Sequence, residues 1–378
     1  MSASSDISSL FKLFGGRADQ YQEFSRDGSP RQRWPIVGGE KAVQSDAPEL
    51  AAAQAEPEVL VEVTSEEAAT PASTAEVSAW SSAGLQSLLA KLALDSQTEP
   101  VPAAVVEPVA ATRPRLEHIR VVAVVSAKGG VGKSTLAANL AAALQRTGRP
   151  LLALDLDPQN ALYHHFQPLD GQQVSTAGIA QLEQDWRDQG VPSSDGVVVL
   201  PYGQVSEQQR RAFESRLHDD PQWLAQHLSD LELAEGALVI IDTPPGPSIY
   251  LQQALSVANV ALVVSLADAA SYTTLPMIDN LIETYTAERQ GFFGAAYLIN
   301  QVDHSRQLSR DITKIMQGLL EQKVLGLVHR DQSITEALAY NRNVLSYDPN
   351  GRGAHDILEC AQALIQRLVS EARVEQPA

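Results

Sequence analysis

Short apolar runs alternate with helical patterns from residue 119 onward. Seven runs are the right length for strands: VVAVVS, LLALDL, VVVLPYG, ALVIIDT, VALVVSL, GAAYLIN and VLGLVH. The first is a continuous apolar run, which is typical of a parallel strand buried on both faces. Strands that alternate with helices predict an α/β fold, a mostly parallel twisted sheet flanked by helices on both faces.

The N-terminal third has a different pattern. Residues 1–37 place Ile7, Leu10, Phe11 and Phe14 on one helical stripe, which predicts a short amphipathic docking segment. Residues 38–118 are rich in Ala, Glu, Pro, Ser and Val and nearly free of aromatic residues, so we expect a long disordered linker. One leucine-rich island in it, residues 79–95, has a helical pattern. The third region, 119–378, is then the folded domain.

Composition narrows the class of protein. The chain has 378 residues, and 44% of them are hydrophobic, which is enough for a sizeable core. Its formal net charge is -18, which disfavours binding of nucleic acid through the overall electrostatic field of the protein. The one cysteine, Cys360, can form neither an internal disulfide nor a cluster site alone. We find no secretory signal and no apolar run long enough to cross a bilayer, so we expect a cytoplasmic protein without an integral membrane segment.

The stretch SAKGGVGKST lies between the first strand and a predicted helix, STLAANLAAALQRTG. Glycines at this turn let backbone N–H groups point at phosphate oxygens, and the helix N-terminus adds partial positive charge. Lys133 can reach the β- and γ-phosphates, and the Ser134 hydroxyl can bind Mg²⁺. The sequence therefore predicts an ATP and Mg²⁺ site whose nucleotide-binding loop comprises Gly129, Gly130, Val131, Gly132, Lys133, Ser134 and Thr135.

Aspartates follow two of the predicted strands. Asp155 and Asp157 end the second strand run, and Asp242 ends the run ALVIIDT. The carboxyl ends of strands are the edge where open α/β sheets bind ligands, and Asp242 has the position of a Walker B aspartate that holds Mg²⁺ directly or through water. Aspartate is also common at turns and helix caps, and this alternative is strongest for Asp155.

The motifs KGGVGKST, DLDPQNA, IIDTPPG and INQVD, in this order, resemble the deviant Walker A ATPases of the MinD/ParA group over roughly residues 119–372. The resemblance implies that Lys128 is the signature lysine, which reaches the partner protomer's nucleotide in an ATP-bound homodimer. It also implies that Asp157 orients the attacking water, that Gly246 offers a backbone donor near the γ-phosphate and that Asn300 reads adenine. The expected catalytic residues are then Lys128, Lys133 and Asp157, in a slow ATPase.

Further segments are similar to one family within this group, the BcsQ ATPases of cellulose synthesis. They are LPYGQVS at 200–206, DWRDQGV at 185–191 and VHRDQSITEALA at 328–339. Residues 6–24 resemble small proteins of the BcsR and BcsP kind. The resemblance implies a spatial or assembly regulator of bacterial cellulose synthesis and secretion that binds components of the secretion complex and is recruited to the inner-membrane synthase. His329 departs from the Ile-Pro-Arg run common in the MinD/ParA group, which leaves base recognition there open.

A second function stays open, that of a ParA-type ATPase that partitions DNA or plasmids. From residue 120 onward there are 19 Lys and Arg against 29 Asp and Glu, a balance that argues mildly against direct DNA binding. The last predicted helix leads into an acidic tail, unlike the basic membrane helix of MinD proteins. The single cysteine argues against an iron–sulfur member of the group.

Overall fold

A computed structural model describes residues 84, 86–87, 89–91, 114, 116–169, 177–181, 185–287 and 289–374. Residues 1–83, and with them the amphipathic segment at 1–37, lie outside this range. In the island predicted to be helical, the described residues 84, 86–87 and 89–91 are helical. Leu89 is buried and belongs to one of the hydrophobic clusters of the folded domain.

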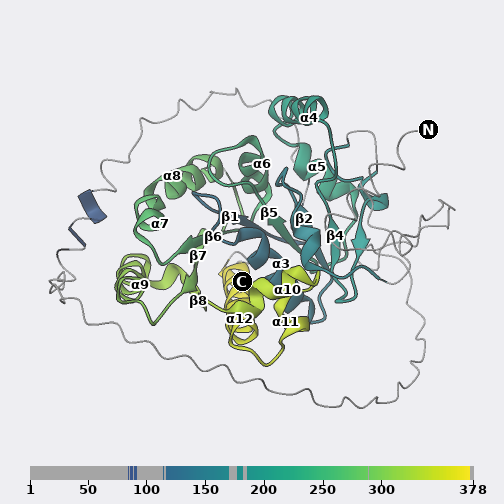
Figure 1. Ribbon diagram of the computed structural model, residues 1–378. Helices are drawn as coiled ribbons and strands as arrows, with labels where there is room; N and C mark the ends of the chain where they lie inside the picture. The colour runs from purple at the N-terminus through teal and green to yellow at the C-terminus, as the bar shows by residue number, and fades with distance from the viewer. Residues whose placement is uncertain are drawn as a thin grey trace, which may run out of the picture. The chain divides into compact units, whose positions relative to one another are not determined.

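The folded domain alternates strands and helices along the chain (Figure 1). Its strands are β1 Arg120–Val125, β2 Leu151–Asp155, β3 Val191–Pro192, β4 Val198–Leu200, β5 Leu238–Asp242, β6 Val260–Leu266, β7 Ala295–Val302 and β8 Val324–His329. Its α-helices are α3 Lys133–Gln145, α4 Glu207–Asp219, α5 Trp223–Asp230, α6 Ile249–Val257, α7 Ala269–Thr273, α8 Leu275–Thr286, α9 Gln307–Leu320, α10 Gln332–Ala339, α11 Val344–Tyr347 and α12 Arg352–Val374. Short 3₁₀ turns are η2 Leu162–His165, η3 Trp186–Asp188 and η4 Glu321–Lys323.

The strands form one sheet in the order β3-β4-β2-β5-β1-β6-β7-β8. The pairings from β4 to β8 are parallel, and β3 pairs antiparallel with β4 at one edge. Each of the seven predicted runs forms a strand, so the prediction of a mostly parallel α/β sheet is confirmed. The two-residue strand β3 was not predicted because so short a pairing has no periodic pattern.

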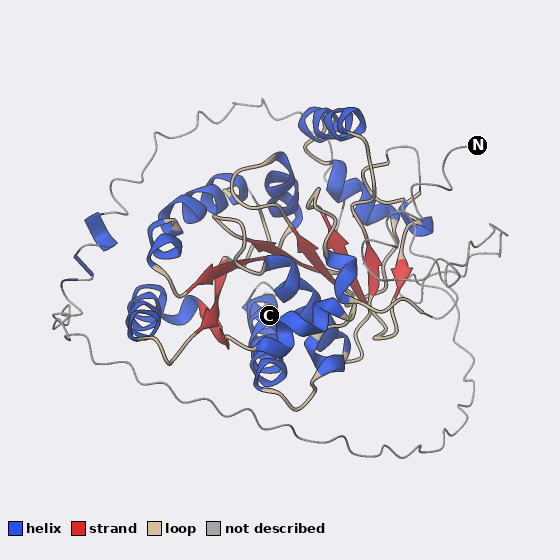
Figure 2. Ribbon diagram, viewed as in Figure 1, coloured by secondary structure: helices blue, strands red, loops and turns tan. Residues whose placement is uncertain are grey.

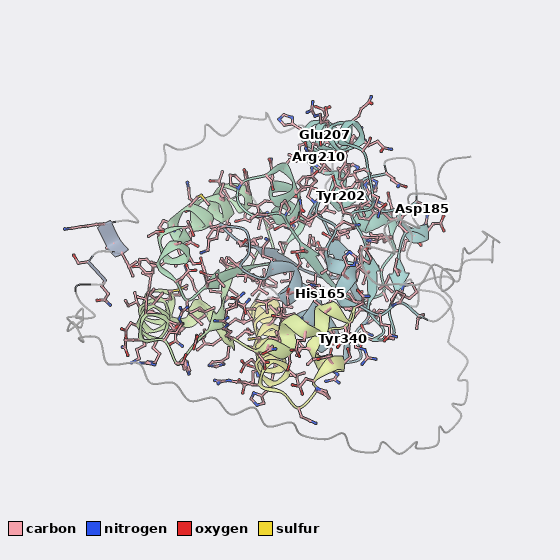
Figure 3. The ribbon with its side chains drawn as sticks, viewed as in Figure 1. His165, Asp185, Tyr202, Glu207, Arg210 and Tyr340 are labelled. Atoms are coloured by element: carbon pink, nitrogen blue, oxygen red, sulfur yellow. The ribbon has the colours of Figure 1, made fainter. Side chains whose placement is uncertain are left out.

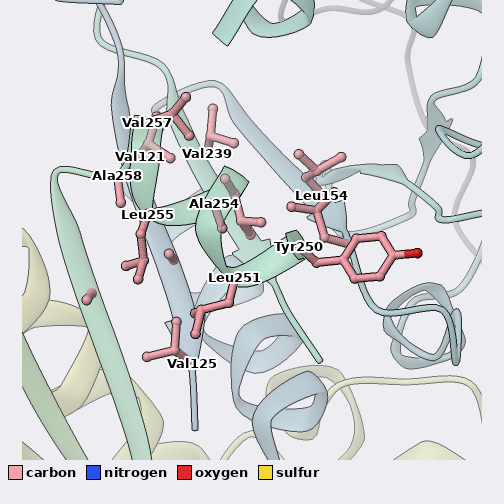
Figure 4. Close-up of a cluster of buried hydrophobic side chains, with 14 of the residues drawn as sticks. Val121, Val125, Leu154, Val239, Tyr250, Leu251, Ala254, Leu255, Val257 and Ala258 are labelled. Atoms are coloured by element: carbon pink, nitrogen blue, oxygen red, sulfur yellow. The ribbon is translucent and has the colours of Figure 1, made fainter. Parts of the chain in front are cut away.

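Helices cover both faces of the sheet, as Figure 2 shows. Alternate residues of β1 point to opposite sides: Val121 and Val125 belong to one hydrophobic cluster, and Val122 and Val124 to the other. The first cluster includes side chains of α4, α5, α6, α8 and α9, and the second those of α3, α11 and α12. Figure 4 shows the first cluster where α6 packs on β1, β2 and β5. Burial on both faces explains why these strand sequences are continuously apolar.

The topology of the sheet determines where the candidate functional site lies. Because parallel strands share one direction, the ends of β1, β2, β5, β6 and β7 lie along the same edge of the sheet. Helix α3 begins there, and its Ala- and Leu-rich sequence packs between the sheet and α12, with Leu136 and Leu140 buried. In the described part of the chain, none of the helices combines the length and apolar character that crossing a bilayer requires.

Candidate functional site

The glycine loop has the conformation that its sequence demands. Gly130 and Gly132 have φ angles of 76° and 89°, in the left-handed region that favours glycine. A Cβ on Gly132 would lie 2.6 Å from the Asn300 side-chain nitrogen, so this position has no space for a larger residue. The loop therefore needs glycine for both its backbone angle and its close contact with β7. Gly132 is the N-cap of α3, which starts at Lys133.

Lys133 lies among the three aspartates that the sequence singled out. It is 7% exposed, and burial lowers its pKa while the charges of Asp242, Asp157 and Asp155 raise it. Asp155 and Asp242 are paired residues on the neighbouring strands β2 and β5, and both are fully buried. The structure thus gathers one cation and three carboxylates at the edge of the sheet, as the strand-end positions predict.

Asp155 shapes the loop that carries Asp157. One oxygen of Asp155 accepts the backbone N–H of Asp157 at 2.9 Å, and the other accepts that of Leu162 at 3.0 Å. Burial and the nearby charge of Asp242 raise the Asp155 pKa well above its ordinary value. Asp157 is 7% exposed, and its Oδ1 accepts the N–H of Gln159. Asp155 therefore fixes the position of Asp157, which leaves Asp157 as the aspartate better placed to meet a ligand.

Asp242 has the properties of a cation ligand. Both its oxygens are buried, and neither has a hydrogen bond of normal geometry among the described residues. Burial raises its pKa to about 7, although the nearby Ser134 hydroxyl and the charge of Lys133 lower it. A buried carboxylate with free oxygens beside a hydroxyl suits Mg²⁺, which prefers oxygen ligands. The residues present therefore fit a Mg²⁺ ion held between Ser134 and Asp242.

The first lysine of the loop points away from this cluster. Lys128 Nζ lies 3.0 Å from both carboxylate oxygens of Asp268, which follows β6. Sequence reasoning assigned no role to Asp268. The signal was nevertheless present, because Asp268 follows the apolar run VALVVSL much as Asp242 ends its own strand.

Asn300 and Gly246 both contact the glycine loop. Asn300, on β7, donates its side-chain N–H to the carbonyl of Val131 at 2.8 Å. Gly246 has a φ of 71° and donates its backbone N–H to the carbonyl of Ser126 at 2.8 Å. The structure thus brings both predicted residues to the loop, and their assignments to adenine and to the γ-phosphate stay predictions. For Gly246 to serve a phosphate, its bond to Ser126 must open.

His329, which departs from the expected proline, is held by α12. Its backbone N–H and its ring Nδ1 both contact Asp356 Oδ2, at 2.8 and 2.9 Å. The His304 ring packs edge-on against it, with ring centroids 4.7 Å apart. The end of β8 therefore has a polar anchor to the last helix where a proline would have offered none.

A cleft of about 370 Å³ adjoins the segment that follows Asp157. Its walls come from residues 158–160 and 163–164 and from the loop that leads into α4, where Asn160 Oδ1 accepts the Gly203 N–H at 3.2 Å. Behind it the Tyr202 and Tyr250 hydroxyls are 2.9 Å apart, and Tyr202, Glu207 and Arg210 lie near one another in Figure 3. In the sequence, residues 200–206 of this loop indicated only a resemblance to the BcsQ ATPases and no role in a site. Its apposition to the Asp157 loop arises from the pairing of β4 with β2.

Comparison with known families agrees with this geometry. A family model described as "Cellulose biosynthesis protein BcsQ" matches residues 119–365. The chain belongs to the BcsQ family. A second model, "Cellulose biosynthesis protein BcsR-like", matches residues 2–39. One chain thus joins a BcsR-like segment to a BcsQ-family domain, as the two resemblances in the sequence suggested.

Individual relatives place the family in a wider group. A BcsQ protein of Escherichia coli K12 is 30% identical over 241 residues, covering 62% of this chain and 89% of its own. The chromosome-partitioning ATPase Soj of Thermus thermophilus is 28% identical, covering 66% and 97%. The fold is similar to that of the septum site-determining protein MinD of Pyrococcus horikoshii complexed with Mg-ADP, with a TM-score of 0.53, 20% identity and coverage of 67% and 98%. The chain is therefore a MinD/ParA-like P-loop protein.

Proposed function

We propose that this protein is an ATP-hydrolysing, ATP-dependently dimerising regulator of bacterial cellulose synthesis and secretion. The observation that carries the proposal is the BcsQ family match over residues 119–365, which spans the complete P-loop cluster. Slow hydrolysis would time the life of the dimer, and the dimer would bind components of the secretion complex in the cytoplasm or at the inner-membrane synthase.

Within one protomer, the buried cluster supplies the groups for ATP. Lys133 would neutralise the β- and γ-phosphates, and the backbone of residues 129–135 would donate N–H groups to them. Ser134 and Asp242 would hold Mg²⁺, which when bound neutralises developing phosphate charge. Asp157 would orient the attacking water and accept its hydrogen bond. Asn300 would read adenine with the amide hydrogen left over from its bond to Val131.

Lys128 would act across the dimer. Lys133 already has three carboxylates around it, whereas Lys128 lies outside that cluster and is 28% exposed. A cation delivered by the second protomer stabilises charge on the γ-phosphoryl oxygens only when the dimer is assembled. Hydrolysis would therefore depend on dimerisation.

The N-terminal segment would dock on partners. The BcsR-like match covers residues 2–39, where the apolar stripe of Ile7, Leu10, Phe11 and Phe14 is too short to bury itself. A segment of this kind needs a surface to bind, and the part of the linker that precedes the buried Leu89, about 50 residues, gives it a typical reach of roughly 40 Å. We infer three functional regions, namely 1–37 for docking, 38–118 as linker and 119–378 as the ATPase.

The test is affinity capture from the native host with the full chain. Asp157→Ala should bind ATP, dimerise and stall, because it keeps Lys133 and the Mg²⁺ ligands but loses the group that orients water. We expect it to retain cellulose-secretion components when ATP is present. Phe11→Asp with Phe14→Asp should lose these partners while ATP binding persists. Equal partner recovery by this double variant and the parent would rule out the docking role.

The similarity to Soj supports a second candidate, an ATPase that partitions DNA. The two functions differ in a salt-dependent property, since nonspecific DNA binding weakens steeply as salt rises. We expect the ATP-locked Asp157→Ala protein to give no appreciable shift of random duplex DNA at physiological salt. Tight, salt-sensitive DNA binding would favour the partition function.

A further inference from the structure

Lys128 is held inside its own protomer. Its Nζ lies 3.0 Å from each oxygen of Asp268, which is 140 residues further along the chain. The Lys128 side chain is 28% exposed and that of Asp268 is 43% exposed, so water reaches the pair. An ion pair in such a place is weak compared with a buried one and can exchange its partners.

Asp268 is the fixed half of this pair. It follows β6 and is the N-cap of α7, where its Oδ1 accepts the Ser271 N–H at 2.7 Å. Its carboxylate is therefore oriented by the backbone whether or not a cation is present. Lys128 has a long flexible side chain and, in the described structure, no other carboxylate within ion-pair distance.

The backbone around Lys128 is fixed as well. Ser126 Oγ donates to the Lys128 carbonyl at 2.8 Å. The Lys128 ammonium can therefore leave Asp268 by rotation of its side chain alone, without refolding of the loop.

We propose that Asp268 is a positioning residue that retains Lys128 in its own protomer, so that ATP-dependent dimerisation exchanges this ion pair for contact with the partner's nucleotide. The inference rests on the proposed function of Lys128 across the dimer. Loss of an exposed ion pair changes the equilibrium constant between the paired and the exchanged state by about 1.4- to 5.4-fold. Because each dimer exchanges two such pairs, Asp268 should raise the dimer dissociation constant by about 2- to 30-fold.

The test is the variant Asp268→Asn in the full chain, with a non-hydrolysable ATP analogue and Mg²⁺. Asparagine is a good N-cap, so the variant keeps the start of α7 and loses only the negative charge. We expect sedimentation equilibrium to give a dimer dissociation constant about 2- to 30-fold lower than that of the parent. Affinity of the monomer for the analogue should stay unchanged, and the melting temperature should fall by no more than about 4 °C. Asp268→Glu should return the constant toward the parent value.

The chain offers a matched control in Asp185. It also caps a short helix by accepting the Arg187 N–H, and it also forms an ion pair, at 2.9 Å, with that arginine. Asp185→Asn should leave the dimer constant unchanged, because the cation that Asp185 holds is Arg187 and not a lysine of the glycine loop.

A double variant separates this inference from the function on which it rests. In a Lys128→Gln background, Asp268→Asn should have no further effect on dimerisation. An equal effect in both backgrounds would mean that Asp268 acts through α7, which overturns the proposal. If Lys128→Gln weakens the dimer but Asp268→Asn does not tighten it, the retaining role is wrong and the action of Lys128 in trans stands. If Lys128→Gln leaves the dimer unchanged, the trans role itself is wrong.

Discussion

The surroundings of Lys133 and Lys128 differ, although the two lysines lie five residues apart in one loop. Lys133 is 7% exposed and sits among Asp155, Asp157 and Asp242 at the ends of two central strands. Lys128 is partly exposed and, among the residues that the structure describes, forms an ion pair with one carboxylate, Asp268, beyond a third strand. The fold itself fixes the first group, whereas a side-chain rotation can undo the second. One loop thus carries a lysine that the fold holds in place and a second lysine that a side-chain rotation can release.

The largest expected effect concerns the buried lysine. Lys133→Met should lower ATP affinity by about 10²- to 10³-fold, because it removes the buried cation that would meet the phosphates and leaves the three nearby aspartates without a compensating charge. Lys128→Met should lower it by less than about ten-fold, since an exposed pair contributes little. Isothermal titration calorimetry with ATP and Mg²⁺ measures both. An equal loss of ATP affinity in the two variants would contradict the proposed difference between Lys133 and Lys128.

The buried carboxylates should make the protein sensitive to pH. Burial holds the pKa of Asp242 at about 7 in the folded chain against an ordinary value of 3.8, and it also raises the pKa of Asp155. Between these values the folded state keeps a proton that the unfolded state has lost, so the stability of the nucleotide-free protein should fall as pH rises from 4 to about 7.

The binding of ATP with Mg²⁺ should depend on pH in the opposite direction, because Mg²⁺ binds the ionised form of the Asp242 carboxylate. The affinity for ATP with Mg²⁺ should therefore rise with pH, by up to about ten-fold per unit below pH 7. Thermal melts and binding titrations across pH 5 to 8 check both trends, and Asp242→Asn should flatten them. An Asp242→Asn protein with the parent's pH profile would contradict this assignment.

The smallest effect concerns stability. Lys128→Gln should change the free energy of unfolding by less than about 1 kcal/mol, because the Lys128–Asp268 pair is partly exposed. Lys133→Gln should have the larger effect in the same urea titration. If the two variants destabilise the domain equally, Lys128 is a structural residue and not an exchangeable one.

Most of the fold could be predicted from the sequence. The strand runs are buried on both faces, so their apolar pattern is strong, and the order of strand, glycine loop and helix located Lys133 and Ser134. Asp242 and Asp157 could be placed because strand ends meet at one edge of a parallel sheet.

The remaining features depend on contacts between distant segments. The pair of Lys128 with Asp268 joins residues 140 positions apart, and the anchor of His329 on Asp356 joins a strand to the last helix. The cleft beside residues 158–164 forms only because β4 pairs with β2. Local sequence patterns do not indicate contacts between residues so far apart in the chain, so these contacts could not be predicted from a single sequence.

Static light scattering of Lys128→Gln with ATP and Mg²⁺, beside the parent chain, tests the central claim most directly. The claim is that Lys128 acts on the nucleotide of a second protomer, whereas Lys133 acts on its own. We predict that the parent reaches the mass of a dimer and that Lys128→Gln stays largely monomeric while still binding ATP. A dimer fraction in Lys128→Gln equal to that of the parent, at the same ATP occupancy, would contradict the account.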